Sequence, residues 1–229
     1  MITGAASGIA RATARLFANE GASLILIDRD AAGLSETARE TNGHPFAVDI
    51  CDQNAVEEAI EAGALSVGGI DGVVNAAGIM LRGSVLEVPV DTWRRVLDVN
   101  LTGMYAVIRS CLPWLQQEHS ATIVNIASAQ GLLPNAPNYT AYATSKGGVV
   151  NLTRALAAEL APNIRVNSIC PGMVDTPMAD GVRANTSNYA MGRLGNPLEI
   201  ARTILFLTGA DSSYVTGVAL AADGGRSFH

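Results

Sequence analysis

The chain has 229 residues with 21 acidic and 15 basic side chains, and its formal net charge of −6 argues against nucleic acid or an anionic membrane surface as the main partner, because both attract basic patches. Its three cysteines and three histidines are scattered without metal-ligand spacing, and no uncharged apolar run approaches the roughly 18 residues of a membrane span. We therefore expect a cytoplasmic protein with no metal, no signal peptide and no membrane anchor.

Short β-branched runs alternate with longer helical patterns, which is typical of βαβ units around a parallel sheet. Strands are predicted at Ser23–Asp28, Pro45–Ile50, Gly72–Asn75, Thr122–Ile126, Ile164–Ile169 and Val218–Ala221. Helices are predicted at Ile9–Glu20, Ala31–Thr41, Asn54–Ser66, Asp91–Gln117, Tyr142–Leu160 and Pro197–Leu207. With no repeat and no linker, residues 1–229 are expected to form one α/β domain, and the mean hydropathy of +0.24 suits a sheet buried on both faces.

A glycine-rich turn, Thr3-Gly4-Ala5-Ala6-Ser7-Gly8, leads directly into the first predicted helix. Glycines at a strand-to-helix turn let the backbone approach a pyrophosphate, and the helix N-terminus supplies free N–H groups. Asp28 ends the second strand, where a carboxylate accepts hydrogen bonds from an adenosine ribose and repels a 2′-phosphate. Glycines alone also mark ordinary turns, but the loop, helix and acid together favour a dinucleotide, and the acid favours NAD.

Tyr142 and Lys146 are four residues apart in a predicted helix and therefore lie on one face. Lys146 is the only lysine, since the other basic residues are arginines. The alternative interpretation is a helical tyrosine beside a solvated lysine. A compact ammonium near a phenol lowers the phenol's pKa from about 10 toward neutrality, where a general acid/base works best. The pair thus predicts a proton-transfer site.

Ser128 follows the predicted strand Thr122–Ile126, at the edge where open α/β sheets place their sites. A serine in this position is more often a turn residue. Its hydroxyl would also be able to hydrogen-bond a substrate oxygen and stabilise developing negative charge.

These motifs, in this order, resemble the short-chain dehydrogenase/reductase family. The resemblance runs from Thr3 to about Gly225 and rests on the glycine turn, Asn75-Ala76-Ala77-Gly78, Asn100, Ser128, Tyr142-x-x-x-Lys146 and Pro171-Gly172. The chain departs from the family pattern at Ala10, where relatives carry glycine for helix–strand packing, and alanine is the mildest replacement. The family implies an NAD(H)-dependent oxidoreductase that interconverts a secondary alcohol and a ketone.

The resemblance also implies roles for individual residues. Asn100, Ser128, Tyr142 and Lys146 would form the catalytic tetrad, with Lys146 holding the nicotinamide ribose and Asn100 positioning a water. NADP-using relatives tend to carry a basic residue just before the second glycine or after the second strand; this chain has Ser7 and Arg29 there, and Asp28 is expected to dominate. The expected cofactor-binding residues are Thr3, Gly4, Ser7, Gly8, Ile9, Asp28, Arg29, Asp49, Ile50, Asn75, Ala76, Ala77, Gly78, Tyr142, Lys146, Pro171, Gly172 and Thr176.

The substrate, a small-molecule alcohol or ketone, would be selected by the loop Ala129–Asn138 and by a small lid near residues 176–192. A 3-oxoacyl-[acyl-carrier-protein] reductase is an alternative, although the negative net charge and Asp28 disfavour docking of an acidic carrier. A non-catalytic dinucleotide sensor on the same fold is a second alternative, which the intact tetrad disfavours. By the resemblance we expect a homotetramer, with helices Asn100–Gln117 and Tyr142–Leu160 paired across a two-fold axis.

The family implies a Rossmann-like doubly wound sheet of about seven strands in the order 3-2-1-4-5-6-7. Its central first strand is truncated here, because only Met1 and Ile2 precede Thr3, against a usual five or six residues. Unpaired backbone groups in neighbouring strands would reduce stability. We expect natural residues to precede Met1, and an extended chain that is no more stable would contradict this.

Overall fold

The computed structural model describes residues 1–180 and 186–227, and these residues contain a seven-stranded parallel sheet. Its order, β3-β2-β1-β4-β5-β6-β7, confirms the predicted doubly wound topology. The strands are β1 Ile2–Thr3, β2 Ile25–Asp28, β3 His44–Ala47, β4 Gly72–Asn75, β5 Ala121–Ile126, β6 Ile164–Pro171 and β7 Ala219–Ala222.

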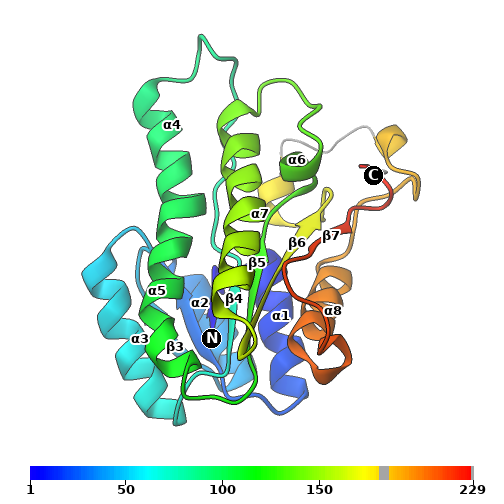
Figure 1. Ribbon diagram of the computed structural model, residues 1–229. Coiled ribbons are helices and arrows are strands. Elements are labelled where there is room, and N and C mark those ends of the chain that lie inside the picture. The colour runs from blue at the N-terminus through cyan, green and yellow to red at the C-terminus, as the bar shows by residue number, and fades with distance from the viewer. Residues whose placement is uncertain (181–185, 228–229) are drawn as a thin grey trace.

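Helices connect successive strands and cover both faces of the sheet (Figure 1). The longer ones are α1 Gly8–Asn19, α2 Ala31–Thr41, α3 Gln53–Val67, α4 Val90–Leu97, α5 Met104–Leu115, α7 Thr140–Leu160 and α8 Pro197–Thr208. A four-residue helix, α6, spans Ala129–Leu132, and a π-helical turn, η1, spans Asp98–Gly103. Short 3-10 turns occur at Pro177–Ala179 (η2), Thr186–Asn188 (η3) and Ala210–Ser212 (η4).

The alternation of side chains along each strand divides the core into two layers. Ile25 and Ile27 face the layer that contains α3, α5 and α7, whereas Leu26 faces the layer that contains α1, α2 and α8. Figure 1 shows α1 and α8 together on one side of the sheet and α3 and α5 on the other. Because both faces are covered, β2 and β5 read as nearly continuous apolar runs.

The central strand β1 has only two residues, as its truncation in the sequence predicts. Ile2 lies between Leu26 and Val74 of its two neighbours, so even this short strand is paired on both sides. The amino group of Met1 donates a hydrogen bond to the Gly72 carbonyl at 2.7 Å. Burial lowers the pKa of this amino group below its ordinary value. The effect of residues before Met1 stays a prediction.

The structure corrects three predicted elements. The third strand ends at Ala47 rather than Ile50, because Asp49 turns the chain by accepting a hydrogen bond from the Cys51 amide at 3.0 Å. The predicted helix Asp91–Gln117 is interrupted by η1. The loop after Ser128 begins as α6, because the Ser128 hydroxyl caps it by accepting a hydrogen bond from the Gln130 amide at 3.1 Å.

The predicted lid near residues 176–192 is described only in part, since residues 181–185 lie outside the described residues. Its ends contain η2 and η3. In residues 1–180 and 186–227, no helix combines the length and the apolar character needed to cross a membrane.

Candidate active site

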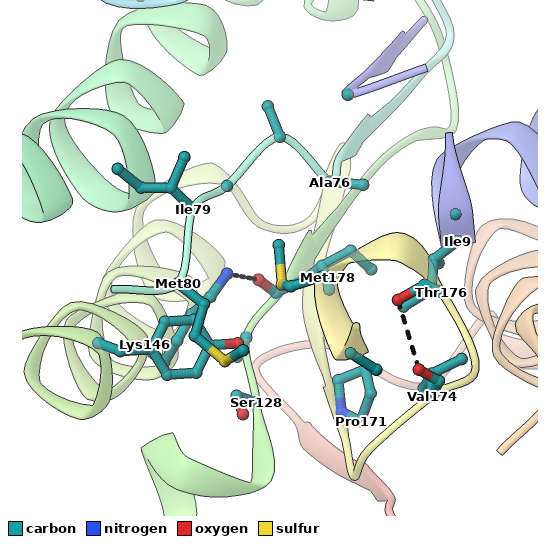
Figure 2. Close-up of a pocket in the computed structure, with 18 of the residues that line it drawn as sticks. Ile9, Ala76, Ile79, Met80, Ser128, Lys146, Pro171, Val174, Thr176 and Met178 are labelled. Atoms are coloured by element: carbon teal, nitrogen blue, oxygen red, sulfur yellow. Dashed lines mark hydrogen bonds between the residues drawn. The ribbon is translucent and has the colours of Figure 1, made fainter. Parts of the chain in front are cut away.

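A cavity of about 720 Å³ lies along the carboxyl ends of the strands. Residues that follow β1, β2, β4, β5 and β6 line it, which is where a doubly wound sheet places its ligands. Gly4 and Asp28 mark one end, and Tyr142 and Arg226 line the other. In Figure 2, Lys146 and Ser128 lie on one side of the cavity, with Ile9 and Thr176 across it.

The glycine turn forms the first end of the cavity. Gly4 has a φ of +73°, and a Cβ on it would lie 2.8 Å from the Ala77 backbone nitrogen, so only glycine fits. Gly8, with a φ of +56°, begins α1. Ser7 caps this helix without a side-chain hydrogen bond, which leaves the first-turn amides of a cavity-lining helix free of a side-chain partner. This cradle fits a pyrophosphate, since it offers close backbone approach and a helix N-terminus.

Asp28 is held in one orientation at the end of β2. Its carboxylate accepts hydrogen bonds from the backbone amides of Ala6 at 3.0 Å and Asp30 at 2.9 Å, and Arg29 lines the cavity beside it. A carboxylate fixed in this way retains lone pairs that suit ribose hydroxyls. This acceptor therefore fits the ribose of an adenosine.

Asp49 lies further along the same wall and also lines the cavity. The Cys51 backbone amide donates to it and Arg95 forms an ion pair with it at 3.0 Å; both lower the pKa of its carboxyl, against partial burial, which raises it.

Most of the other predicted cofactor-binding residues line the cavity. They come from different parts of the chain and line the same cavity: Ile9, Ile50, Ala76, Ala77, Gly78, Pro171, Gly172 and Thr176. Thr3 and Asn75 do not line it. The Thr3 hydroxyl accepts hydrogen bonds from the amides of Ala76 at 3.2 Å and Ala77 at 3.3 Å, so it fixes the loop that does line the cavity. The Asn75 amide donates to Asn125 inside the core.

Asn100 is fully buried in the π-helical turn and is absent from the cavity wall. Its side chain accepts a hydrogen bond from the Ile79 amide at 2.8 Å and donates to the Ile79 carbonyl at 2.9 Å and to the Ser145 hydroxyl at 3.0 Å. These contacts tie the loop after β4 to the helix that carries Tyr142. In this structure Asn100 organises the site through its neighbours.

Tyr142 and Lys146 lie on the buried face of α7, as their spacing predicts. The Lys146 Nζ donates to the Ile126 carbonyl at 2.7 Å, the contact dashed in Figure 2, and lies 5.8 Å from the centre of the Tyr142 ring. Burial lowers the pKa of Lys146 from 10.5 to about 8. A lysine with a pKa this close to neutrality is suited to proton transfer.

The Tyr142 phenol does not have the low pKa that the sequence predicts. Burial raises the pKa of the Tyr142 phenol above its usual value, and hydrogen bonding with Ser128 opposes that rise. Removing a charged phenolate from water is the largest effect, and the Lys146 ammonium, 5.8 Å from the ring centre, does not offset it.

Four aromatic and basic residues that the motifs did not single out as binding residues complete the second end of the cavity. The guanidinium of Arg82 lies 5.0 Å from the ring centre of Tyr139, and that of Arg226 lies 5.9 Å from the ring centre of Tyr189. Tyr139 also lines the cavity. Gln130 also lines the cavity, and its buried side-chain oxygen has no hydrogen-bond partner among the described residues.

The chain is similar to known proteins over nearly its whole length. The family described as "Enoyl-(Acyl carrier protein) reductase" matches residues 4–227. The 3-oxoacyl-[acyl-carrier-protein] reductase FabG of Thermotoga maritima is 38% identical, with 98% of this chain and 96% of that protein covered. Galactitol 2-dehydrogenase of Cereibacter sphaeroides is 41% identical, with 98% of this chain and 92% of that protein covered.

Solved structures agree with these sequence relatives. A 3-ketoacyl-(acyl-carrier-protein) reductase from Brucella melitensis complexed with NADH has a TM-score of 0.94 at 35% identity and covers 99% of this chain and 96% of its own. A metagenomic blue fluorescent protein in complex with NADPH has a TM-score of 0.93 at 30% identity and covers 98% and 96%. The chain belongs to the short-chain dehydrogenase/reductase family, and it is an oxidoreductase.

Proposed function

We propose that the protein interconverts a secondary alcohol and a ketone with a nicotinamide cofactor, and that Tyr142 is the acid/base. The observation that carries the proposal is that one continuous cavity has the glycine cradle and Asp28 at one end and Ser128, Tyr142 and Lys146 at the other. A dinucleotide bound from the glycine cradle to the other end of the cavity would place its nicotinamide ring beside Tyr142.

The residues divide the work of alcohol oxidation. When bound, the nicotinamide supplies the acceptor for the hydride that leaves the carbinol carbon. Tyr142, as phenolate, takes the hydroxyl proton, so that one proton and one hydride are removed and the carbonyl forms. The Ser128 hydroxyl donates a hydrogen bond to the substrate oxygen, and the Lys146 ammonium stabilises the phenolate. In ketone reduction the same groups act in reverse.

For the cofactor we propose NAD(H). Asp28 supports this choice, because its fixed carboxylate would repel a 2′-phosphate, and Ser7 adds no positive charge near that position. Arg29 lines the cavity beside Asp28 and acts in the opposite direction, but its flexible side chain is solvated.

The test is turnover of a panel of secondary alcohols with NAD⁺ and of ketones with NADH. Tyr142→Phe is expected to lower kcat by about 10³-fold while NADH binding stays within a few-fold, because only the proton carrier is lost. Lys146→Arg is also expected to fail, since the planar guanidinium does not match the ammonium site. Tyr214→Phe, at a fully exposed tyrosine, is the matched control. Turnover by Tyr142→Phe near the wild-type rate would overturn the proposal and leave a nucleotide sensor as the alternative.

A 3-oxoacyl-[acyl-carrier-protein] reductase is the second candidate, and the 38% identity to the Thermotoga maritima enzyme favours it. Reduction of a 3-oxoacyl thioester at least as efficient as that of any simple ketone in the panel would establish this candidate over the first.

We also propose a homotetramer, as in the family. Tyr105, on one of the two helices expected to form the interface, is 51% exposed, and Val90, at the start of the neighbouring helix α4, is 63% exposed. Exposed apolar side chains at these positions support a subunit interface. A monomeric mass by light scattering at micromolar concentration would contradict the proposal.

A further inference from the structure

Arg226 is partly buried and lines the end of the cavity that also holds Tyr142. It follows β7 in a turn built on Asp223, whose carboxylate accepts hydrogen bonds from the amides of Gly225, Arg226 and Ser227 at 2.9–3.2 Å. Burial works to raise the pKa of Asp223, but hydrogen bonds from Ser227 and the neighbouring amides hold it below its ordinary value. The turn is therefore a firm base for the arginine.

Two contacts fix the direction of the Arg226 side chain. Its Nη2 donates to the Asn135 side-chain oxygen at 2.8 Å, and its guanidinium lies over the Tyr189 ring. Tyr189 is in turn fixed, since its hydroxyl accepts a hydrogen bond from the Met173 amide at 3.1 Å. Arg226 thus bridges the two segments expected to select the substrate, the loop after Ser128 and the chain after Thr176.

The remaining terminal nitrogen of Arg226, Nη1, is buried and has no hydrogen-bond partner among the described residues. A guanidinium does not lose its proton in proteins, so this group is a charged donor withdrawn from water. An unsatisfied buried donor destabilises the fold, and a charged donor does so more than a neutral one. Because Arg226 lines the cavity, a ligand that binds there is a source of the missing acceptor.

The charges around it indicate what that acceptor is. At this end of the cavity the charged lining residues are Arg82, Lys146 and Arg226, all cationic, although the chain as a whole has a net charge of −6. The acidic residues that line the described cavity, Asp28 and Asp49, lie at the adenosine end. An anionic group on a ligand would be attracted and oriented by these lining cations, whereas a neutral polyol would gain no such charge pairing.

We propose that Arg226 binds a carboxylate on the substrate, so that the preferred substrates are secondary alcohols or ketones that carry a carboxylate. The planar carboxylate accepts a hydrogen bond from Nη1 and balances the excess positive charge. This assignment rests on the proposed function, because it places the reacting hydroxyl at Tyr142 while the carboxylate lies at Arg226. Arg226 becomes a specificity residue rather than a catalytic one.

The experiment compares acids with their uncharged amides in three pairs of increasing size: lactate and lactamide, 3-hydroxybutyrate and its amide, and 4-hydroxycyclohexanecarboxylate and its amide. Oxidation of each is measured with NAD⁺, and binding of each to the NADH-saturated protein by calorimetry. The variants are Arg226→Gln and, as the matched control, Arg94→Gln, which removes the same charge from an exposed arginine outside the cavity.

For at least one pair, the wild type is expected to prefer the acid over the amide in both measurements. Arg226→Gln is expected to abolish that preference. It is expected to raise the KM and Kd of the acid about 30-fold or more and to leave the KM and Kd of the amide nearly unchanged. Arg94→Gln is expected to retain the preference. No preference for the acid in any pair, or a preference that survives Arg226→Gln, would overturn the carboxylate assignment. A different result would contradict the proposed function itself, namely turnover that persists in Tyr142→Phe.

Discussion

The two ends of the cavity recognise their ligands by different physical means. The glycine end works with backbone geometry, in which Gly4, the first turn of α1 and the fixed Asp28 leave space and donors for a cofactor. The tyrosine end works with buried ionisable side chains, whose pKa values are displaced by burial. Substitutions at the first end therefore act through sterics and charge repulsion, whereas substitutions at the second act through proton equilibria.

The largest effect is expected from Gly4→Ala, compared with Gly21→Ala. Both glycines have positive φ, but the new Cβ would meet the Ala77 backbone at position 4 and nothing within 4 Å at position 21. Gly21→Ala is expected to lower the free energy of unfolding by about 1 kcal/mol. Gly4→Ala is expected to lower it by roughly 3–5 kcal/mol, because overpacking adds to the backbone strain, and to weaken NADH binding. Denaturant unfolding measures the free energy of unfolding of both variants, and fluorescence titration measures their NADH affinity. Equal losses of stability in Gly4→Ala and Gly21→Ala would contradict the steric argument.

Lys146→Met is expected to stabilise the protein at pH 7 while it abolishes activity. With a pKa of about 8 in the folded protein and 10.5 as its ordinary value, Lys146 binds more protons in the unfolded chain between these two pH values. Wild-type stability therefore rises from pH 8 to 10.5, and the full penalty, about 3 kcal/mol, is present below pH 8.

Removal of the lysine ends that penalty but leaves the Ile126 carbonyl without its donor. The net gain is expected to be about 2 kcal/mol, or a Tm rise of about 4–8 °C. Thermal unfolding at pH 7 and pH 10 tests the cause, since the gain is expected to shrink at the higher pH. A gain that is independent of pH would point to packing instead.

The two reaction directions are expected to have opposite pH dependence near pH 8. Ketone reduction needs protons on both Tyr142 and Lys146, so its kcat/KM falls about tenfold per pH unit once the pH passes the pKa of about 8. Alcohol oxidation needs the form in which Tyr142 and Lys146 together carry one proton fewer. Its kcat/KM is therefore expected to rise until the pH reaches about 8 and then to stay level until Tyr142 titrates. Parallel profiles in both directions would contradict this assignment of the pair.

The smallest effect is expected from Asp28→Asn. Loss of the charge is expected to weaken NADH binding about tenfold and to strengthen NADPH binding, since the amide no longer repels a 2′-phosphate. Glu36→Gln is the control, because Glu36 is an exposed acid paired with Arg11 outside the cavity wall. Tighter NADPH than NADH binding by the wild type would refute the cofactor assignment.

The parts of the molecule that depend on local spacing were predictable from the sequence. The strand order followed from the family motifs, and the position of Tyr142 and Lys146 on one buried face followed from their i, i+4 spacing. Asp28 lies at the carboxyl end of β2, where the predicted strand Ser23–Asp28 placed it.

Features that depend on tertiary environment were not predictable. The raised pKa of Tyr142 comes from burial that no local pattern encodes. Arg226 and Asn135 meet from positions 91 residues apart, and nothing in the sequence around either residue signals the contact. Thr3 and Asn75 belong to binding motifs, yet their side chains support the cavity wall from behind.

The π-helical turn at Asp98–Gly103 has a consequence for how this chain tolerates length changes. A π turn holds one residue more than an α-helical turn, so it is equivalent to a single inserted residue. Deleting one residue there would let α4 and α5 join as one regular helix and rotate the following side chains by roughly 100°. Asn100 would then lose Ile79 and Ser145, and Gly103 would lose its close packing beside the Ile50 carbonyl. In an evolving lineage, this helix pair is therefore expected to keep its residue count even while its sequence drifts.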